Sequence, residues 1–128
     1  MAQQNVVITK KRRQNLCKAS AGDITLPTIV GMAFGDGGVD SGGNVITPSD
    51  NQSALNNQLL RKACDSHTMV DNSVCRYVCT LSEAQLAGES ISEIGLYDSA
   101  GDLVIIKNFP AKGKGSDEQM TFTLDDTF

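Results

Sequence analysis

The sequence is poor in large aromatic side chains and contains no long apolar segment. Among its 128 residues there is no tryptophan, only one histidine, and an aromatic content of 5%. No apolar run approaches the roughly 18 residues that a membrane-spanning helix needs, and no apolar segment follows the N-terminal positive charges as it would in a signal peptide. We therefore expect a soluble protein with no membrane partner and no signal peptide.

Acidic side chains are missing from the first part of the chain. Residues 1–22 hold five basic side chains, whereas the remainder holds six basic and fifteen acidic ones. The chain is therefore bipolar, and its basic segment at residues 10–13 is either a docking surface for an acidic partner or a solvated helix face. Because the acidic remainder would repel phosphates, we expect no nucleic-acid partner.

The most strongly patterned stretch, residues 91–110, is predicted to be a β-hairpin. Two apolar runs flank a turn at residues 98–102, which is rich in Asp, Ser and Gly. The second run, residues 103–106, is apolar on both faces, so the hairpin should lie inside the sheet rather than at an edge. We expect Pro110 to end the hairpin and Gly95 to mark a bulge or a close backbone approach.

The remaining pattern predicts an α+β fold, a mostly antiparallel β-sheet with an N-terminal helix and a second short helix. A chain of 128 residues with 12 glycines fits one β-rich domain, residues 1–128, which can bury about two thirds of its unfolded surface. The expected elements are a strand at 5–8, a helix at 10–19 capped by Thr9, a strand at 24–34, a loop at 35–44, the second helix at 47–56, two hairpin strands at 59–70 and 74–81, a turn or loop at 82–88, a polar loop at 112–117 and a last strand at 120–124. The predicted core residues are Val30, Met32, Ile94, Leu96, Val104, Ile106, Phe122 and Leu124.

The four cysteines and the single histidine require a test for zinc. Cys64 with His67, and Cys75 with Cys79, are spaced like pairs of zinc ligands. On a strand, however, Cys75 and Cys79 would stand about 13 Å apart, too far for a shared zinc ion or a disulfide. We therefore predict no metal site and reduced, buried thiols. No pattern supports a calcium loop, a phosphate-binding loop or a catalytic nucleophile, so we expect no cofactor and no enzymatic activity.

Several segments resemble the phage tail-collar fibre family, in the order in which that family has them. The clearest is the run Ile-Ser-Glu-Ile-Gly-Leu-Tyr-Asp at 91–98, followed by Gly-Asp-Leu at 101–103 and Asn-Phe-Pro at 108–110. Thr9 with its helix, the run Ile-Val-Gly-Met-Ala-Phe-Gly-Asp-Gly at 29–37, and Thr47-Pro48 with Ala54-Leu55 are also similar to the family. The resemblance therefore covers nearly the whole chain.

This resemblance implies a structural virion protein, without catalytic residues, that joins a tail fibre to the baseplate of a contractile tail or of a phage-derived injection particle. It implies a homotrimer that is assembled in the host bacterial cytoplasm and has baseplate and fibre proteins as partners. Family members usually continue into a fibre shaft, whereas this chain stops at the last strand of the attachment module, so we expect a short adaptor or a truncated chain. The alternative is a glycan-binding or receptor-binding module at the tail tip, which the scarcity of aromatic side chains disfavours.

The partner-binding residues that we predict are Lys10, Lys11, Arg12, Arg13 and Phe128. The four basic side chains fall in the first turn of the predicted helix, where they oppose the helix dipole and do not stabilise the helix. Phe128 would gain up to about 1.5–3 kcal/mol if a neighbouring chain buried it. We therefore expect both ends of the chain, residues 1–8 and 121–128, to contact neighbouring chains.

Overall fold

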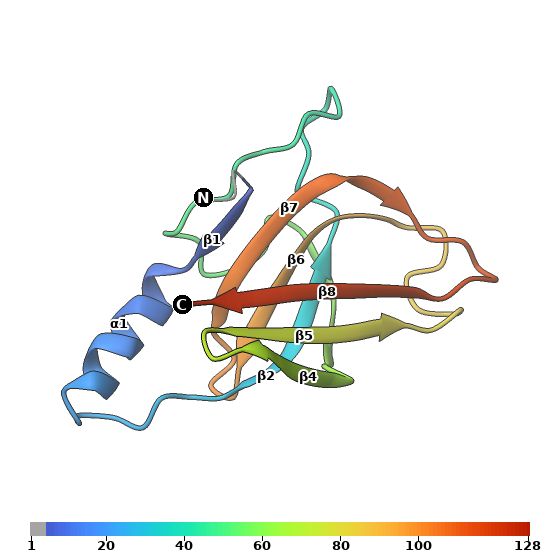
Figure 1. Cartoon of the computed structure of the whole chain (residues 1–128). Helices are drawn as coiled ribbons and strands as arrows, with labels where there is room; N and C mark the ends of the chain where they lie inside the picture. The colour runs from blue at the N-terminus through green and yellow to red at the C-terminus, as the bar shows by residue number, and fades with distance from the viewer. Residues whose placement is uncertain (1–4) are drawn as a thin grey trace.

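The computed structural model describes residues 5–128, which form two antiparallel sheets and one helix (Figure 1). In chain order the elements are β1 (Val6–Ile8), α1 (Lys10–Ser20), β2 (Ile29–Gly35), β3 (Gln58–Ala63), β4 (Ser66–Asp71), β5 (Val74–Leu81), β6 (Ser90–Asp98), β7 (Leu103–Gly113) and β8 (Met120–Thr127). The larger sheet has the strand order β1-β7-β6-β2-β3, and the smaller one β4-β5-β8. A mostly antiparallel β fold is therefore confirmed, with 48% of the residues in strands, but the described chain has one helix where two were expected.

The hairpin predicted at residues 91–110 lies at the centre of the larger sheet. β6 and β7 pair with each other, and each has another strand on its outer side, so the interior placement is confirmed. Asp98 closes the turn, because its Oδ1 atom accepts hydrogen bonds from the backbone N–H groups of Ala100 and Asp102, both at 3.0 Å. Gly101 takes a φ of +88°, which favours glycine at this position of the turn.

Two details of the hairpin concern proline and glycine. Pro110 does not end β7 as expected, because the strand continues beyond it. The pairing shifts register between Ile91 and Glu93, which places Pro110 in an irregular part of the ladder where no N–H donor is needed. Gly95 lies in regular pairing and marks a close approach, since a Cβ there would be 3.0 Å from the carbonyl oxygen of Ile105.

The inner faces of the two sheets meet in an apolar core. Phe34 of β2 and Phe122 of β8 contact each other edge to face, with ring centroids 5.3 Å apart. The predicted core residues Met32, Ile94, Leu96, Val104, Ile106, Phe122 and Leu124 are all buried. The prediction was wrong for Val30, which is 40% exposed. The strand predicted to begin at residue 24 begins only at Ile29, the first residue of β2.

A long loop, residues 36–57, covers the outer face of the larger sheet. Leu55 from this loop packs against Ala33 of β2 and against Leu103 and Ile106 of β7. Because of this cover, β2 is buried on both faces over most of its length, and the half-buried alternation predicted for it is not realised.

The second helix predicted at residues 47–56 does not form. The backbone N–H of Ser49 donates to the side chain of Gln52 at 2.8 Å, a capping-type bond, but the chain makes only a turn there and no helix follows. Farther along, the N–H groups of Asn56 and Asn57 donate to the carboxylate of Glu93 on β6. Contacts across the fold therefore hold this segment in an irregular conformation.

The strand predicted at residues 59–70 is in fact two strands, β3 and β4, in different sheets. Between them, Asp65 binds β5 twice: its N–H donates to the carbonyl of Val78, and its carboxylate accepts the N–H of Thr80, each at 2.8 Å. These bonds fix the position at which the chain leaves the larger sheet and enters the smaller one. The hairpin predicted around residues 71–73 is confirmed as β4 and β5.

The polar loop predicted at residues 112–117 is partly buried. Its first residues extend β7, and Lys114 is buried with its ammonium donating to the carbonyl oxygens of Glu83 and Gly115, both at 2.9 Å. The loop and the turn at residues 82–88 therefore hold each other in place.

Helix α1 has the N-cap that the sequence predicted, Thr9. The Oγ1 atom of Thr9 accepts the N–H of Arg12 at 3.2 Å and donates to the carbonyl of Leu103 at 2.7 Å, so the N-cap also ties the helix to β7. Gly22, with a φ of +80°, closes the C-terminal turn.

Replacing Gly38 with alanine should destabilise the fold by about 1–3 kcal/mol. The added Cβ would lie 2.0 Å from the backbone oxygen of Ser92, which cannot move without distorting β6. Gly113→Ala is the matched control, since nothing lies within 4 Å of its Cβ position, and it should change the free energy of unfolding by less than about 0.5 kcal/mol. Urea denaturation measures both changes, and equal stability of the two variants would contradict the close packing of the loop on β6.

Candidate docking surface

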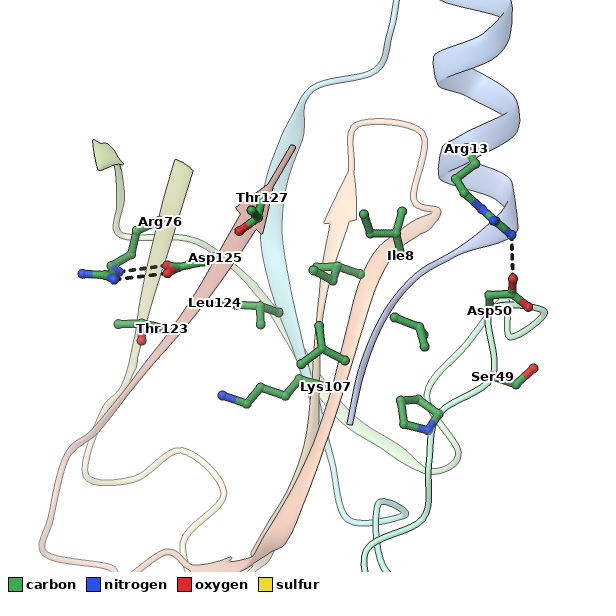
Figure 2. A pocket seen from close by; sticks show the side chains of 14 residues that line it. Ile8, Arg13, Ser49, Asp50, Arg76, Lys107, Thr123, Leu124, Asp125 and Thr127 are labelled. Carbon is green, nitrogen blue, oxygen red and sulfur yellow. Dashed lines mark hydrogen bonds and ion pairs between the residues drawn. The ribbon is translucent and has the colours of Figure 1, made fainter. Parts of the chain in front are cut away.

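A groove of about 850 Å³ lies where the edges of the two sheets meet. β1 and β8 form its two sides, with β7 between them, and residues 48–50 lie beyond β1 (Figure 2). The apolar part of the lining is Val6, Val7, Ile8, Pro48, Ile105 and Leu124, and the charged part is Arg13, Asp50, Arg76, Lys107 and Asp125. Of the described residues that line the groove, none is aromatic, so it gives no support to the glycan-binding alternative.

Two ion pairs border this groove. Arg13 pairs with Asp50 at 2.5 Å, and Arg76 donates two hydrogen bonds to the carboxylate of Asp125, at 2.8 and 3.1 Å. Exposed pairs of this kind contribute little to stability. Lys107 has no ion-pair partner among residues 5–128, so it is the uncompensated charge of the groove.

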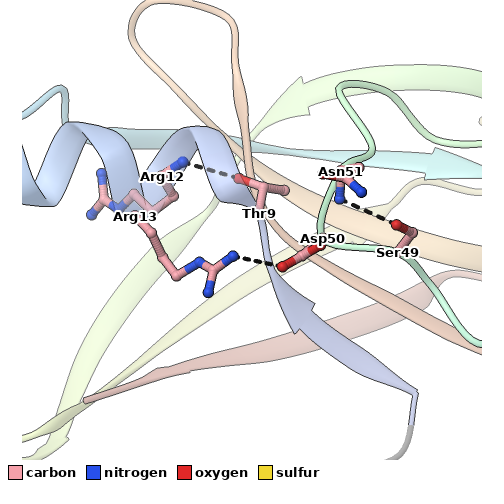
Figure 3. Close-up of polar contacts among 6 residues, drawn as sticks. All are labelled: Thr9, Arg12, Arg13, Ser49, Asp50 and Asn51. Carbon is pink, nitrogen blue, oxygen red and sulfur yellow. Dashed lines mark hydrogen bonds and ion pairs between the residues drawn. The ribbon is translucent and has the colours of Figure 1, made fainter.

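The basic start of α1 is held by Asp50 of the covering loop (Figure 3). The backbone N–H of Lys10 donates to the carbonyl of Asp50 at 2.7 Å, and the guanidinium of Arg13 pairs with the carboxylate of the same residue. Together with the Thr9 cap, these contacts fix the direction in which the first turn of α1 faces solvent.

The structure separates the four basic residues that were predicted to bind a partner. Lys10, Lys11 and Arg13 are exposed, whereas Arg12 is buried and donates to the carbonyl of Pro27 at 3.0 Å. Arg12 therefore serves the interior of the fold, and the exposed basic surface consists of the other three.

Phe128, the fifth residue predicted to bind a partner, is 69% exposed. Its backbone N–H donates to the carbonyl of Ser73 at 2.8 Å, which places it beside the turn between β4 and β5. At the other end of the chain, residues 1–4 of the expected N-terminal contact lie outside the described residues.

Buried Arg12 influences two ionisable side chains of the smaller sheet. Burial raises the pKa of Asp126 on β8, and the positive charge of Arg12 opposes this rise. Burial also raises the pKa of Tyr77 on β5 above its usual range, an effect that Cys75 and Asp126 strengthen and Arg12 opposes. In both cases burial favours the neutral form of the side chain.

A buried carboxylate on β6 holds the covering loop. Glu93 is fully buried and accepts hydrogen bonds from the backbone N–H groups of Gly37, Asn56 and Asn57, each at 2.8 Å. A Cβ at Gly35 or Gly37 would lie 2.5 or 2.9 Å from this carboxylate, which explains the Gly-Asp-Gly sequence. Sequence reasoning missed this role, and the available signal was one acidic residue within an apolar strand.

The thiols differ in their environments. Cys75 and Cys79 are buried as predicted, Cys64 is partly buried, and Cys17 is exposed, contrary to the prediction. Burial, aided by nearby Asp65, raises the pKa of Cys64 to about 11. Burial, aided by Cys64, raises the pKa of Cys79 to about 12, so both thiols stay protonated at neutral pH.

Residues 5–128 contain neither grouped metal ligands nor a helix that could span a membrane. No three or more His, Cys, Asp or Glu side chains in this part of the chain are grouped so that they could hold a metal ion. None of its helices has the length and apolar character needed to span a membrane.

The family model of the phage tail-collar fibre protein, N-terminal region, matches residues 1–123, nearly the whole chain. The chain belongs to the phage tail-collar fibre family. Comparison with curated proteins and with solved structures gave no match. Membership makes this chain a structural component of the phage tail, in a family that is generally non-enzymatic and whose members associate with other tail or fibre proteins.

In this tail-collar fibre domain, the residues that carry the resemblance build the fold. Glu93 holds the covering loop, Asp98 closes the central turn, and Gly95 lets β6 approach β7 closely. Binding in this domain therefore depends on its surfaces, of which the groove and the start of α1 are the most distinctive.

Glu93→Gln should lower the free energy of unfolding by about 1–3 kcal/mol. An amide in place of the carboxylate would turn an N–H group toward at least one of the three backbone donors and leave that donor unsatisfied. Exposed Glu89→Gln is the control and should change stability by less than about 0.5 kcal/mol. Amide hydrogen exchange should speed up at Asn56 and Asn57, and unchanged protection there would contradict the role of Glu93.

Asp126→Asn should stabilise the domain at neutral pH. Because folding raises the pKa of Asp126 above its ordinary 3.8, the stability that this group contributes is present below 3.8 and is lost as pH rises through the folded-state value. The asparagine side chain stays neutral, so the variant should exceed the wild type at pH 7, and its advantage should shrink below pH 3.8. Thermal denaturation at both pH values checks this, with exposed Asp117→Asn as a control; no advantage at pH 7 would contradict it.

Proposed function

We propose that this tail-collar fibre domain joins a tail fibre to the baseplate of a contractile tail, as a homotrimer assembled in the host bacterial cytoplasm. Residues 1–128 would act as one unit. The observation that carries the proposal is the family match over residues 1–123. It is supported by the buried charged groups of Arg12, Glu93 and Lys114, which bind backbone groups of the fold itself, as expected of a rigid connector.

The exposed start of α1 is the surface that we propose for an acidic baseplate neighbour. Lys10 and Lys11 form no ion pair with any residue of the described chain, and Arg13 has only its exposed pair with Asp50. Positive charges at a helix N-terminus cost about 0.3–1 kcal/mol each. A contact with carboxylates of a partner would offset that cost.

Phe128 is the second proposed contact, with a fibre chain or a neighbouring copy. Its side chain is more exposed than any other large apolar side chain in residues 5–128. Burying it would contribute up to about 1.5–3 kcal/mol to the association.

Replacing Lys10 and Lys11 with glutamate should reduce the amount of this protein in assembled particles several-fold at physiological salt. The same change should stabilise the isolated domain by about 0.3–1 kcal/mol per site, since glutamate complements the helix dipole, so a loss of assembly would not reflect misfolding. Quantitative mass spectrometry of purified particles measures the incorporation.

The control for this experiment is Lys18→Glu, which reverses an exposed charge in the last turn of the same helix. It should leave incorporation unchanged. If the Lys10 and Lys11 variant also entered particles at the wild-type level, the basic surface would be solvated only, and its role in docking would be rejected.

A further inference from the structure

The smaller sheet has two open edges, formed by β4 on one side and β8 on the other. The β8 edge is long and regular: eight consecutive residues pair with β5 without a register shift. β8 also contains no proline, whereas proline and bulges are common devices that protect an edge strand from pairing with another chain. The open side of β8 therefore has the features of a strand that can accept a partner.

β4, at the other edge of the smaller sheet, is exposed at all six of its residues. Met69 and Val70 are 60% and 48% exposed, and only Phe128 among the large apolar side chains of the described part of the chain exceeds Met69. One side of β4 pairs with β5, regularly from Ser66 to Met69 and with a register shift between Met69 and Asp71, and no strand of residues 5–128 covers the other side. A strand with apolar side chains and an open edge is suited to pairing with a second chain.

The groove beside β8 matches such a strand in length, polarity and charge. β4 spans about 20 Å and β8 about 26 Å at the usual rise per residue, so the shorter strand fits along the longer one. Val6, Val7 and Ile8 of β1, all partly exposed, give the groove an apolar lining for side chains such as Met69. Its uncompensated charge is positive, whereas the segment from residue 65 to residue 71 contains two aspartates and no lysine or arginine.

We propose that β4 of one copy adds to the open edge of β8 of a second copy, with its apolar side chains in the groove. The two surfaces differ, so the contact is head to tail, and repetition of such a contact closes a ring when the rotation between copies permits. The inference rests on the proposed function in one respect, that copies of the domain assemble. It names the surfaces by which they do so.

Sedimentation velocity of the purified full chain over a range of concentrations tests this proposal. The wild type should associate, and the double variant Met69→Lys, Val70→Lys should weaken association by about tenfold or more, because two lysines would lose the apolar contacts and add positive charge beside Lys107. The matched control is Ile24→Lys, Ile46→Lys, which changes two exposed apolar residues outside β4 and β8 and should associate like the wild type. All four positions are exposed, so each variant should keep the wild-type Tm.

Cross-linking provides an independent measurement. A mixture of isotopically labelled and unlabelled chains, treated with a carbodiimide, should give a link between Lys107 of one copy and Asp65 or Asp71 of another. A monomeric wild type, undiminished association of the β4 variant, or links confined to single chains would overturn the inference. Incorporation into particles separates a failure of this contact from a failure of the proposed function. If the protein enters particles normally but does not associate through β4 and β8, the proposed function stands and only this contact is rejected.

Discussion

A buried carboxylate is the interaction on which much of this fold depends. Glu93 lies inside the larger sheet, where an unpaired charge would be strongly destabilising. Its partners come from both ends of the covering loop, Gly37 at the start and Asn56 and Asn57 at the finish. One side chain thereby fastens the loop over the outer face of the sheet, and the fastened loop delivers Leu55 to the apolar cluster beneath it. Gly35 and Gly37 follow from the same constraint, since a Cβ at either position would occupy the space of the carboxylate.

The loop in turn determines how α1 is presented. Asp50, in the middle of the loop, accepts the N–H of Lys10 through its carbonyl and the guanidinium of Arg13 through its carboxylate. Thr9 adds a bond to the carbonyl of Leu103 on β7, so the helix start is fixed to both the loop and the sheet. The position of the exposed basic surface is therefore a consequence of contacts that begin at Glu93 on β6, in the middle of the larger sheet.

This distribution of contacts suits a structural member of a phage tail. The buried charged side chains of Arg12, Glu93 and Lys114 form hydrogen bonds with backbone groups of the same chain, so they stabilise the fold and do not face a partner. What is left for partners is the start of α1, the two open edges of the smaller sheet and the groove beside β8. Surfaces of this kind are formed by several elements at once, and they are suited to extended contacts with other chains rather than to the chemistry of a small ligand.

The sequence by itself determined the features that depend on residues close together in the chain: the Thr9 cap, the turn closed by Asp98 and the doubly apolar start of β7. Caps, turns and strand periodicity act over a few residues, so their signals are readable without a fold. Only the tertiary structure decided that residues 47–56 are irregular, that Arg12 and Lys114 are buried, and that β1, β7 and β8 enclose a groove. In each of these cases the deciding partner is remote, as Glu93 is from Asn56 across 37 residues, and a local pattern contains no information about a group that arrives from another strand.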